Sequence, residues 1–246
     1  MISENNQIFQ IYIQDIDNEP LPEPIQECIA TVINNKSELN HYLLGNEALR
    51  EVIRTNLDSD VLNAYDRLVP YTYKSDLGRH CLLYLFGGWY LDATVRLQKV
   101  IPVRVDAKLV VFKDAPNPGM PSWDLSTSVI YGNKGHKVFE MMIQRIVQNV
   151  KEEFYGTTPL SPTGPTLFGK CLAEMGEDAS TITGMLAPLT PHHQYKNYAF
   201  ITPNGEILAY GKQSWGTVKG DGLSAFTKTG TNSYNELYYN KQIYKR

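Results

Sequence analysis

The sequence predicts an α/β fold, a single Rossmann-like domain with a mixed central sheet flanked by helices. The chain of 246 residues is long enough for one sizeable domain and short for two, so we expect residues 1–246 to form one unit. Short apolar runs of strand character alternate with segments of helical periodicity through the first half of the chain. In the second half, Pro203-Asn204-Gly205 lies between two further apolar runs, which is typical of a β-hairpin.

The elements of the first half follow from apolar periodicity and from capping residues. In order we expect a strand at Ile8–Ile13, a proline-rich loop ending at Pro24, a helix from Ile25 to about Asn34, a strand at Glu38–Leu44, a helix from Asn46, a helix capped by Asp58 or Ser59, and a helix opened by Ser75-Asp76 that stops at Gly87-Gly88.

The second half is interpreted in the same way. The expected elements are strands at Trp89–Val95, Leu109–Phe112 and Ser128–Tyr131, an amphipathic helix from about Lys137 to Phe154, a loop at Thr157–Gly164, a helix at Thr166–Met175, and hairpin strands at Tyr198–Thr202 and Glu206–Tyr210.

Composition excludes several classes of protein. A formal net charge of -3 without a basic cluster argues against a nucleic-acid partner. The three cysteines, Cys28, Cys81 and Cys171, are far apart, which argues against a disulfide framework and for a reducing, cytoplasmic location. The polar N-terminus does not resemble a signal peptide, and no apolar run approaches the roughly 20 residues that span a bilayer.

The segment Ser75–Val95 carries the chemistry. Asp76 and Arg79 are three residues apart, so on a helix they share a face, and a carboxylate beside a guanidinium suits a polyhydroxylated, anionic ligand. Asp92 and Thr94 are two apart, so on a strand both point to one side, where two oxygen ligands can hold a divalent cation. Each pair also has a simpler interpretation: a helix-dipole or surface ion pair for the first, and a turn cap for Asp92.

The two pairs in one ordered segment are harder to explain by packing alone than either pair by itself. Ser-Asp-x-x-Arg, an apolar helix, Gly-Gly and aromatic-Leu-Asp-x-Thr closely resembles the DXD-containing sugar-transferase family. That family includes bacterial capsule and lipopolysaccharide transferases, initiating mannosyltransferases and, distantly, the clostridial glucosylating toxins. The resemblance implies a GT-A fold over residues 1–246, a nucleotide-sugar donor, and transfer with retention of anomeric configuration.

Site residues are carried over by position. The resemblance places Asp76, Arg79 and Gly164 at the donor sugar, because Thr163-Gly164-Pro165 resembles the family's Thr-Gly-Pro loop before a helix near the sugar pocket. It places Ile11, Tyr12, Tyr90, Asp92 and Trp215 at the nucleotide. Asp92 and Thr94 would hold Mn²⁺ or Mg²⁺, and no catalytic base is assigned. Two positions depart from the family pattern: Thr94 replaces the second acid, as in the capsular branch, and Gly78 stands where a bulkier residue is usual.

The outlying positions keep ordinary alternatives. Tyr12 is equally an aromatic residue of a sheet, Pro165 is a good first residue of any helix, and Trp215 is equally a core indole. His192 and His193 follow Pro191 in an expected loop, and they and His136 are interpreted as surface residues. Asp124, after Trp123, is either a turn-forming residue or a contact to an acceptor.

The sequence therefore predicts a metal-dependent hexosyltransferase that uses a UDP- or GDP-hexose, with UDP favoured. The acceptor is a glycan or lipid-linked glycan in capsule or lipopolysaccharide synthesis, which allows peripheral membrane association without a transmembrane segment. Two alternatives remain: a non-catalytic sugar-nucleotide or glycan binder, motivated by Thr94, and an effector that glycosylates a protein.

Overall fold

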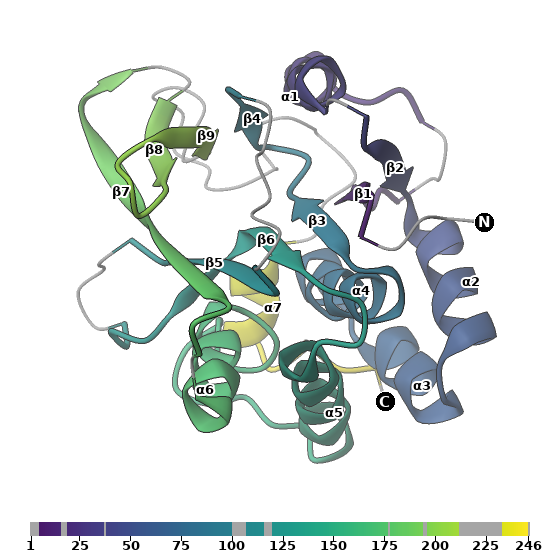
Figure 1. Ribbon diagram of the computed structural model, residues 1–246. Coiled ribbons are helices and arrows are strands. Elements are labelled where there is room, and N and C mark those ends of the chain that lie inside the picture. Colours follow the sequence, from purple (N-terminus) through teal and green to yellow (C-terminus); the bar gives the residue numbers. More distant parts are fainter. Residues whose placement is uncertain are drawn as a thin grey trace.

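The computed structural model describes residues 5–15, 19–36, 38–99, 107–115, 120–176, 178–193, 196–211 and 233–245, with the side chains of 190–197 excepted. These residues form one nine-stranded sheet and seven helices (Figure 1). The strands are β1 Gln7–Ile11, β2 Asn40–Leu44, β3 Gly88–Leu91, β4 Arg96–Leu97, β5 Leu109–Lys113, β6 Leu125–Gly132, β7 Thr181–His193, β8 Lys196–Ile201 and β9 Ile207–Gly211. The helices are α1 Glu23–Asn35, α2 Asn46–Asn56, α3 Ser59–Arg67, α4 Tyr71–Phe86, α5 Lys137–Lys151, α6 Pro165–Met175 and α7 Tyr234–Tyr239.

The sheet is mixed, with the strand order β2-β1-β3-β6-β5-β7-β8-β9-β4. β1 pairs in parallel with both β2 and β3, and β5 pairs in parallel with β7. β6 lies antiparallel between β3 and β5, and β7, β8, β9 and β4 continue as antiparallel neighbours. The sheet curls, so that β4, which follows β3 directly in the chain, pairs with β9 at the far end of the strand order (Figure 1). This confirms the α/β fold class with a mixed sheet and the hairpin at 203–205.

Two faces of the sheet bury different residues. The larger core joins side chains of β1, β3, β5 and β6 to helices α2–α7. The smaller core lies under α1 and the β7–β9 region and includes Trp89, Phe112 and Phe200. The three cysteines are buried thiols, as expected for a protein without a disulfide framework. None of the helices in the described ranges is both long and apolar enough to cross a bilayer.

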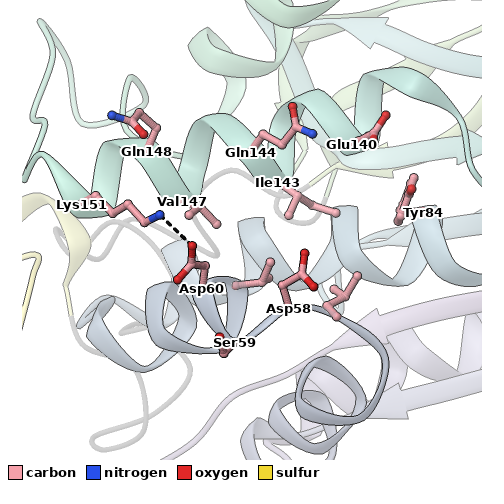
Figure 2. A pocket seen from close by; sticks show the side chains of 12 residues that line it. Asp58, Ser59, Asp60, Tyr84, Glu140, Ile143, Gln144, Val147, Gln148 and Lys151 are labelled. Carbon is pink, nitrogen blue, oxygen red and sulfur yellow. Dashed lines mark hydrogen bonds and ion pairs between the residues drawn. The ribbon is translucent and has the colours of Figure 1, made fainter.

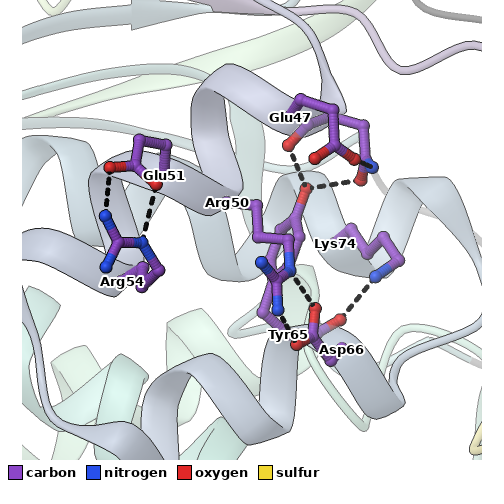
Figure 3. Close-up of polar contacts among 8 residues, drawn as sticks. Glu47, Arg50, Glu51, Arg54, Tyr65, Asp66 and Lys74 are labelled. Carbon is purple, nitrogen blue, oxygen red and sulfur yellow. Dashed lines mark hydrogen bonds and ion pairs between the residues drawn. The ribbon is translucent and has the colours of Figure 1, made fainter.

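Polar contacts join α2, α3 and α4 on the helical side (Figure 3). Arg50 of α2 donates two hydrogen bonds to the Asp66 carboxylate of α3, at 2.8 and 2.7 Å. Lys74 of α4 is buried, donates to the Tyr65 carbonyl at 2.5 Å and lies 4.2 Å from the centre of the Tyr65 ring. Burial lowers the pKa of Lys74 to about 8. These contacts fix the N-terminal half of α4, which carries the candidate site.

The start of α4 differs from the prediction. Ser75-Asp76 does not open this helix, which begins at Tyr71 directly after Pro70. Proline fixes φ, and the Pro70 carbonyl accepts from the Lys74 amide at 3.0 Å, so the helix begins here without a capping side chain. Asp76 therefore lies in the second turn, away from the helix N-terminus. The C-terminal end is as predicted, because Gly87 ends the helix with a φ of +66°.

The end of β3 also differs from the prediction. The strand stops at Leu91, and residues 92–95 form a turn in which the Val95 amide donates to the Asp92 carbonyl at 2.9 Å. The expected strand Trp89–Val95 is thus wrong beyond Leu91. Asp92 and Thr94 do not share the alternating geometry of a strand, and the argument that their spacing makes a cation site no longer holds.

Three elements were not predicted: β4, β7 and α7. β7 spans Thr181–His193 and places the backbone of His193 in a strand paired with Lys196, where a loop was expected. Its sequence contains Gly184, Pro188 and Pro191, which are typical of loops. β7 nevertheless forms because it has pairing partners on both sides, β5 and β8.

Candidate functional site

The candidate site lies at one edge of the sheet, where the parallel strands β1 and β3 end. Tyr12 follows β1 and Asp92 follows β3. The carboxyl ends of neighbouring parallel strands are the usual ligand-binding edge of an open α/β sheet. Asp92 is fixed by its backbone: its amide donates to the Ser128 carbonyl at 2.8 Å, and its carbonyl accepts from the Gln10 side chain at 3.2 Å.

Arg79 links two carboxylates. From α4, its Nη2 lies 3.2 Å from Oδ1 of Asp76, and its Nη1 lies 3.2 Å from Oδ1 of Asp92. It also donates to the backbone carbonyls of Ser75, at 3.1 Å, and of Thr127. Asp76, Arg79 and Asp92, which the motif placed in one pocket, therefore belong to one connected array.

Tyr90 packs against this array from β3. Its ring centre lies 4.6 Å from the Arg79 guanidinium carbon, and its hydroxyl donates to Oδ1 of Asp92 at 2.8 Å. Tyr90 and Arg79 are buried, whereas the Asp92 side chain is 28% exposed. Asp92 is thus the member of the array that reaches solvent.

Burial governs the ionisation of the array. It raises the pKa of Asp76 to about 6, although Arg79 and the Thr163 hydroxyl both lower it. Burial on its own lowers the pKa of Arg79, but its three acidic neighbours raise it further than burial lowers it. A buried ion pair with a strongly shifted carboxyl pKa marks the array as a candidate functional site.

The Thr163-Gly164-Pro165 loop lies against Asp76. The Thr163 side chain is buried and its hydroxyl donates to Oδ2 of Asp76 at 2.7 Å. Gly164 is the N-cap residue of α6, and a Cβ at this position would lie 3.4 Å from the same carboxylate oxygen. The structure thus brings Gly164 beside the predicted donor-sugar residues, more than eighty positions away in the chain.

Ile11 and Tyr12 lie on opposite faces of the sheet. Ile11 is buried in the larger core, so its side chain faces the helices. Tyr12 packs with Ile25, Ile29 and Ala93, the residue next to Asp92. The Tyr12 hydroxyl is buried without a hydrogen-bond partner among the described residues, and burial raises its pKa.

The described residues offer little for a metal ion. No group of three His, Cys, Asp or Glu side chains is close enough to hold one in the described ranges. Oδ1 of Asp92 is engaged by Tyr90 and Arg79, and within the same ranges Oδ2 has no protein partner. Thr94 lies in the turn and is partly exposed. The residues therefore fit a cation that takes one carboxylate oxygen from the protein and its remaining ligands from phosphate and water.

Trp215 lies outside the described residues. Sequence reasoning missed two other contributors: Gln10, which holds the backbone of Asp92, and Thr127, whose carbonyl accepts from Arg79. No pattern in the sequence pointed to Thr127, because its place depends on the pairing of β3 with β6. The role of Thr163 was foreshadowed only by the Thr-Gly-Pro resemblance.

Gly78, the second departure from the family pattern, has a packing explanation. A Cβ added at Gly78 would lie 2.4 Å from Cδ2 of Leu49, a buried residue of α2. Leu49 thus fills the space that a larger side chain at position 78 would need.

A separate groove of about 580 Å³ lies between α3 and α5 (Figure 2). Asp58, Asp60 and Glu140 contribute carboxylates to its lining, and the amine of Lys151 lies 2.8 Å from Asp60. None of the array residues lines this groove. Its acidic lining would repel a diphosphate, so we do not assign the donor to it.

Comparisons with known proteins identify the family and the fold of the chain. The family model described as "Capsular polysaccharide synthesis protein" matches residues 1–155, which include Asp76, Arg79 and Asp92. An uncharacterized glycosyltransferase of Acanthamoeba polyphaga mimivirus is 29% identical over 96 residues, covering 38% of this chain and 37% of the relative. The chain thus matches little more than a third of the length of that relative.

Two solved glycosyltransferase structures are similar to this chain to different degrees. The PaToxG glycosyltransferase superposes with a TM-score of 0.50 at 16% identity, covering 70% of each chain. A glycosyltransferase involved in glycosylation of the major capsid of PBCV-1 has a TM-score of 0.40 at 13% identity, covering 72% of this chain and 80% of that one. The first likeness supports a glycosyltransferase fold for the described residues. The family model matches more than half of the length of this chain, and the chain therefore belongs to the capsular polysaccharide synthesis protein family.

Proposed function

We propose that the protein is a retaining hexosyltransferase that moves a hexose from a nucleotide diphosphate sugar to a hydroxyl of a glycan or lipid-linked glycan in capsule synthesis. UDP is the favoured nucleotide, GDP the alternative, and lipopolysaccharide a second possible product. The observation that carries the proposal is the buried array Asp76–Arg79–Asp92 at the carboxyl edge of β1 and β3. Family membership and the mimivirus glycosyltransferase relative support the same reaction class. The cytoplasmic location, with peripheral membrane association, is part of this proposal.

Asp76 is proposed to accept hydrogen bonds from the hydroxyls of the donor sugar. An ionised carboxylate is an acceptor only, which suits hydroxyl groups. Arg79 holds Asp76 and Asp92 in fixed relative positions through its two terminal nitrogens. Gly164 leaves room beside Asp76 that a larger side chain would fill. Together these residues orient the sugar so that its anomeric carbon faces the acceptor.

Asp92 is proposed to bind on the diphosphate side, with Tyr90 fixing its Oδ1 and Thr94 contributing directly or through water. Mn²⁺ or Mg²⁺, held by Asp92 and by the phosphates, would neutralise charge on the leaving diphosphate. Tyr12 is proposed at the nucleotide base because it packs against Ala93, beside Asp92, and its buried hydroxyl has no described partner. Ile11 would contribute through its backbone, and Trp215 is assigned by resemblance alone.

The test is Asp92→Asn, with Asp58→Asn as a matched control. Asp58 is an exposed carboxylate before α3 whose side chain makes no capping hydrogen bond. Hydrolysis of UDP- and GDP-sugars, with and without Mn²⁺, is measured for both variants and the wild type. We expect at least a hundredfold loss for Asp92→Asn and none for Asp58→Asn. Donor turnover that survives Asp92→Asn unchanged would overturn the proposal.

Thr94, which stands where the family has a second acid, motivates one alternative, a sugar-nucleotide or glycan binder without catalysis. A thermal-shift series with UDP, GDP and their hexoses, each with Mn²⁺, separates the two functions when read beside donor hydrolysis. An enzyme is stabilised by its donor and hydrolyses it, whereas a binder is stabilised and hydrolyses nothing.

A further inference from the structure

A second buried carboxylate lies at the same edge of the sheet, outside the donor array. Asp124 precedes β6 and is 5% exposed. Its Oδ2 accepts from the Thr166 hydroxyl at 3.1 Å, whereas Oδ1 is buried without a hydrogen-bond partner in the described part of the chain. A buried carboxylate oxygen without a partner costs free energy, so such a group in a native protein requires an explanation, of which a functional role in binding is one.

The backbone around Asp124 is well defined. β5 ends at Lys113, which pairs with Leu125 of β6, and the Asp114 amide donates to the Asp124 carbonyl at 2.9 Å. β6 runs antiparallel to β3, so its first residues lie beyond the end of β3, on the side where Asp92 is found. Asp124 and Asp92 therefore belong to the same edge.

The first turn of α6 connects the two carboxylate sites. Thr163, just before the helix, donates to Asp76, and Thr166, in its first turn, donates to Asp124. Gly164 lies between these threonines, against Asp76. A ligand at Asp124 is therefore one helical turn away from the residues proposed to hold the donor sugar.

Exposed apolar side chains border Asp124. Trp123 is 52% exposed and Met185 is 54% exposed. Met185 pairs with Lys113 at the end of β5, so it lies at the same corner. The Trp123 backbone rests on α6, since a Cβ at Gly169 would lie 1.9 Å from the Trp123 carbonyl oxygen.

We propose that Trp123 and Asp124 form the acceptor subsite, in which a sugar ring of the glycan stacks on the exposed indole and one of its hydroxyls donates to Oδ1 of Asp124. The inference rests on the proposed function and adds to it the surface that selects the acceptor. Oδ2 is already engaged by Thr166, so Oδ1 is the Asp124 oxygen left to accept from a ligand.

The chemistry of this corner selects a neutral saccharide. Asp114 and Asp124 are both acidic, so they repel phosphate and carboxylate ligands. Burial raises the pKa of Asp124 to about 6, so the side chain is ionised at neutral pH and accepts hydrogen bonds without donating any. An indole beside such a carboxylate matches a hexose, which combines an apolar face of C–H groups with hydroxyls at its rim.

The experiment compares transfer with hydrolysis in Trp123→Ala, Trp123→Phe and Asp124→Asn. The probes are methyl glycosides of glucose, galactose and mannose, offered with the nucleotide sugar that the wild type hydrolyses. Tyr239→Ala is the control, because Tyr239 is an aromatic residue of α7 that is 71% exposed. Stabilisation by UDP is measured for each variant as a check on folding and donor binding.

For Trp123→Ala and Asp124→Asn we expect the ratio of transfer to hydrolysis to fall at least about tenfold, with stabilisation by UDP retained. Trp123→Phe should recover part of the loss, and Tyr239→Ala should match the wild type. An unchanged ratio in both variants, or a parallel loss of UDP stabilisation, would overturn the acceptor subsite while leaving the donor site in place. A wild-type protein that neither hydrolyses nor is stabilised by any nucleotide sugar would instead refute the proposed function and the subsite with it.

Discussion

Replacing Asp76 by asparagine should change stability in a pH-dependent way. Compared with the wild type at the same pH, the variant should be more favoured at neutral pH than in acid. Burial raises the pKa of Asp76 to about 6 from an ordinary value of 3.8. The difference of about 2.2 units corresponds to roughly 3 kcal/mol at 1.36 kcal/mol per unit. Between these two pKa values the folded state holds more protons than the unfolded state. The contribution of Asp76 to stability is therefore fully present below pH 3.8 and is lost as the pH rises through 6.

Urea unfolding of the wild type and Asp76→Asn from about pH 4.5 to about pH 7.5 isolates this contribution, because asparagine does not titrate. We expect the free energy of unfolding of the wild type, minus that of the variant, to fall by about 2 kcal/mol across this range, most of the total. Donor turnover should change in the opposite sense, with at least a hundredfold loss in the variant. A flat or rising difference would refute the reasoning, because it would mean that the carboxylate is not destabilised by burial.

Three further predictions follow from burial and packing. Lys74→Met should lose its stability advantage over the wild type as the pH rises from about 8 to 10.5. The folded-state pKa of Lys74 is lowered to about 8, and the cost of burying the charged amine disappears once the amine is neutral. Urea unfolding at several alkaline pH values measures the difference between variant and wild type, and a constant difference would contradict the prediction. Gly169→Ala should lower the free energy of unfolding in urea by about 1–3 kcal/mol and weaken acceptor-dependent transfer, because the added Cβ would meet the Trp123 carbonyl oxygen at 1.9 Å. A variant as stable as the wild type would show that the backbone of Trp123 does not rest on α6. Gly78→Ala should destabilise the wild type more than it destabilises a Leu49→Ala background, measured by a double-mutant cycle, and strict additivity would show that the two residues do not compete for space.

The α4–β3 segment shows what a local pattern can predict. Asp76 and Arg79 share a helix face, Gly87 ends that helix, and a strand follows, as the spacing predicted. The pattern failed at both ends of the segment. Pro70 and Ser75 are both reasonable helix starts, and apolar residues continue past Leu91, so neither boundary can be derived from residue types alone.

The remaining partners of the site depend on contacts between distant segments. Thr127 accepts from Arg79 because β6 pairs with β3, and Thr163 reaches Asp76 because α6 begins beside α4. Neither contact leaves a periodic trace in the sequence. The resemblance identified the Thr-Gly-Pro loop, but only the structure shows that its threonine donates to the carboxylate.

The charge of the array gives a physical reason to propose a cation. The array combines two acidic side chains and one guanidinium, a formal net charge of -1, and it has no unengaged positive group. A diphosphate that approached Asp92 directly would meet a carboxylate with one oxygen open to a further ligand. A divalent ion held by Asp92 would reverse the sign of this interaction. The proposal therefore gives the more exposed Asp92 to the diphosphate side of the donor and the buried Asp76 to its neutral sugar.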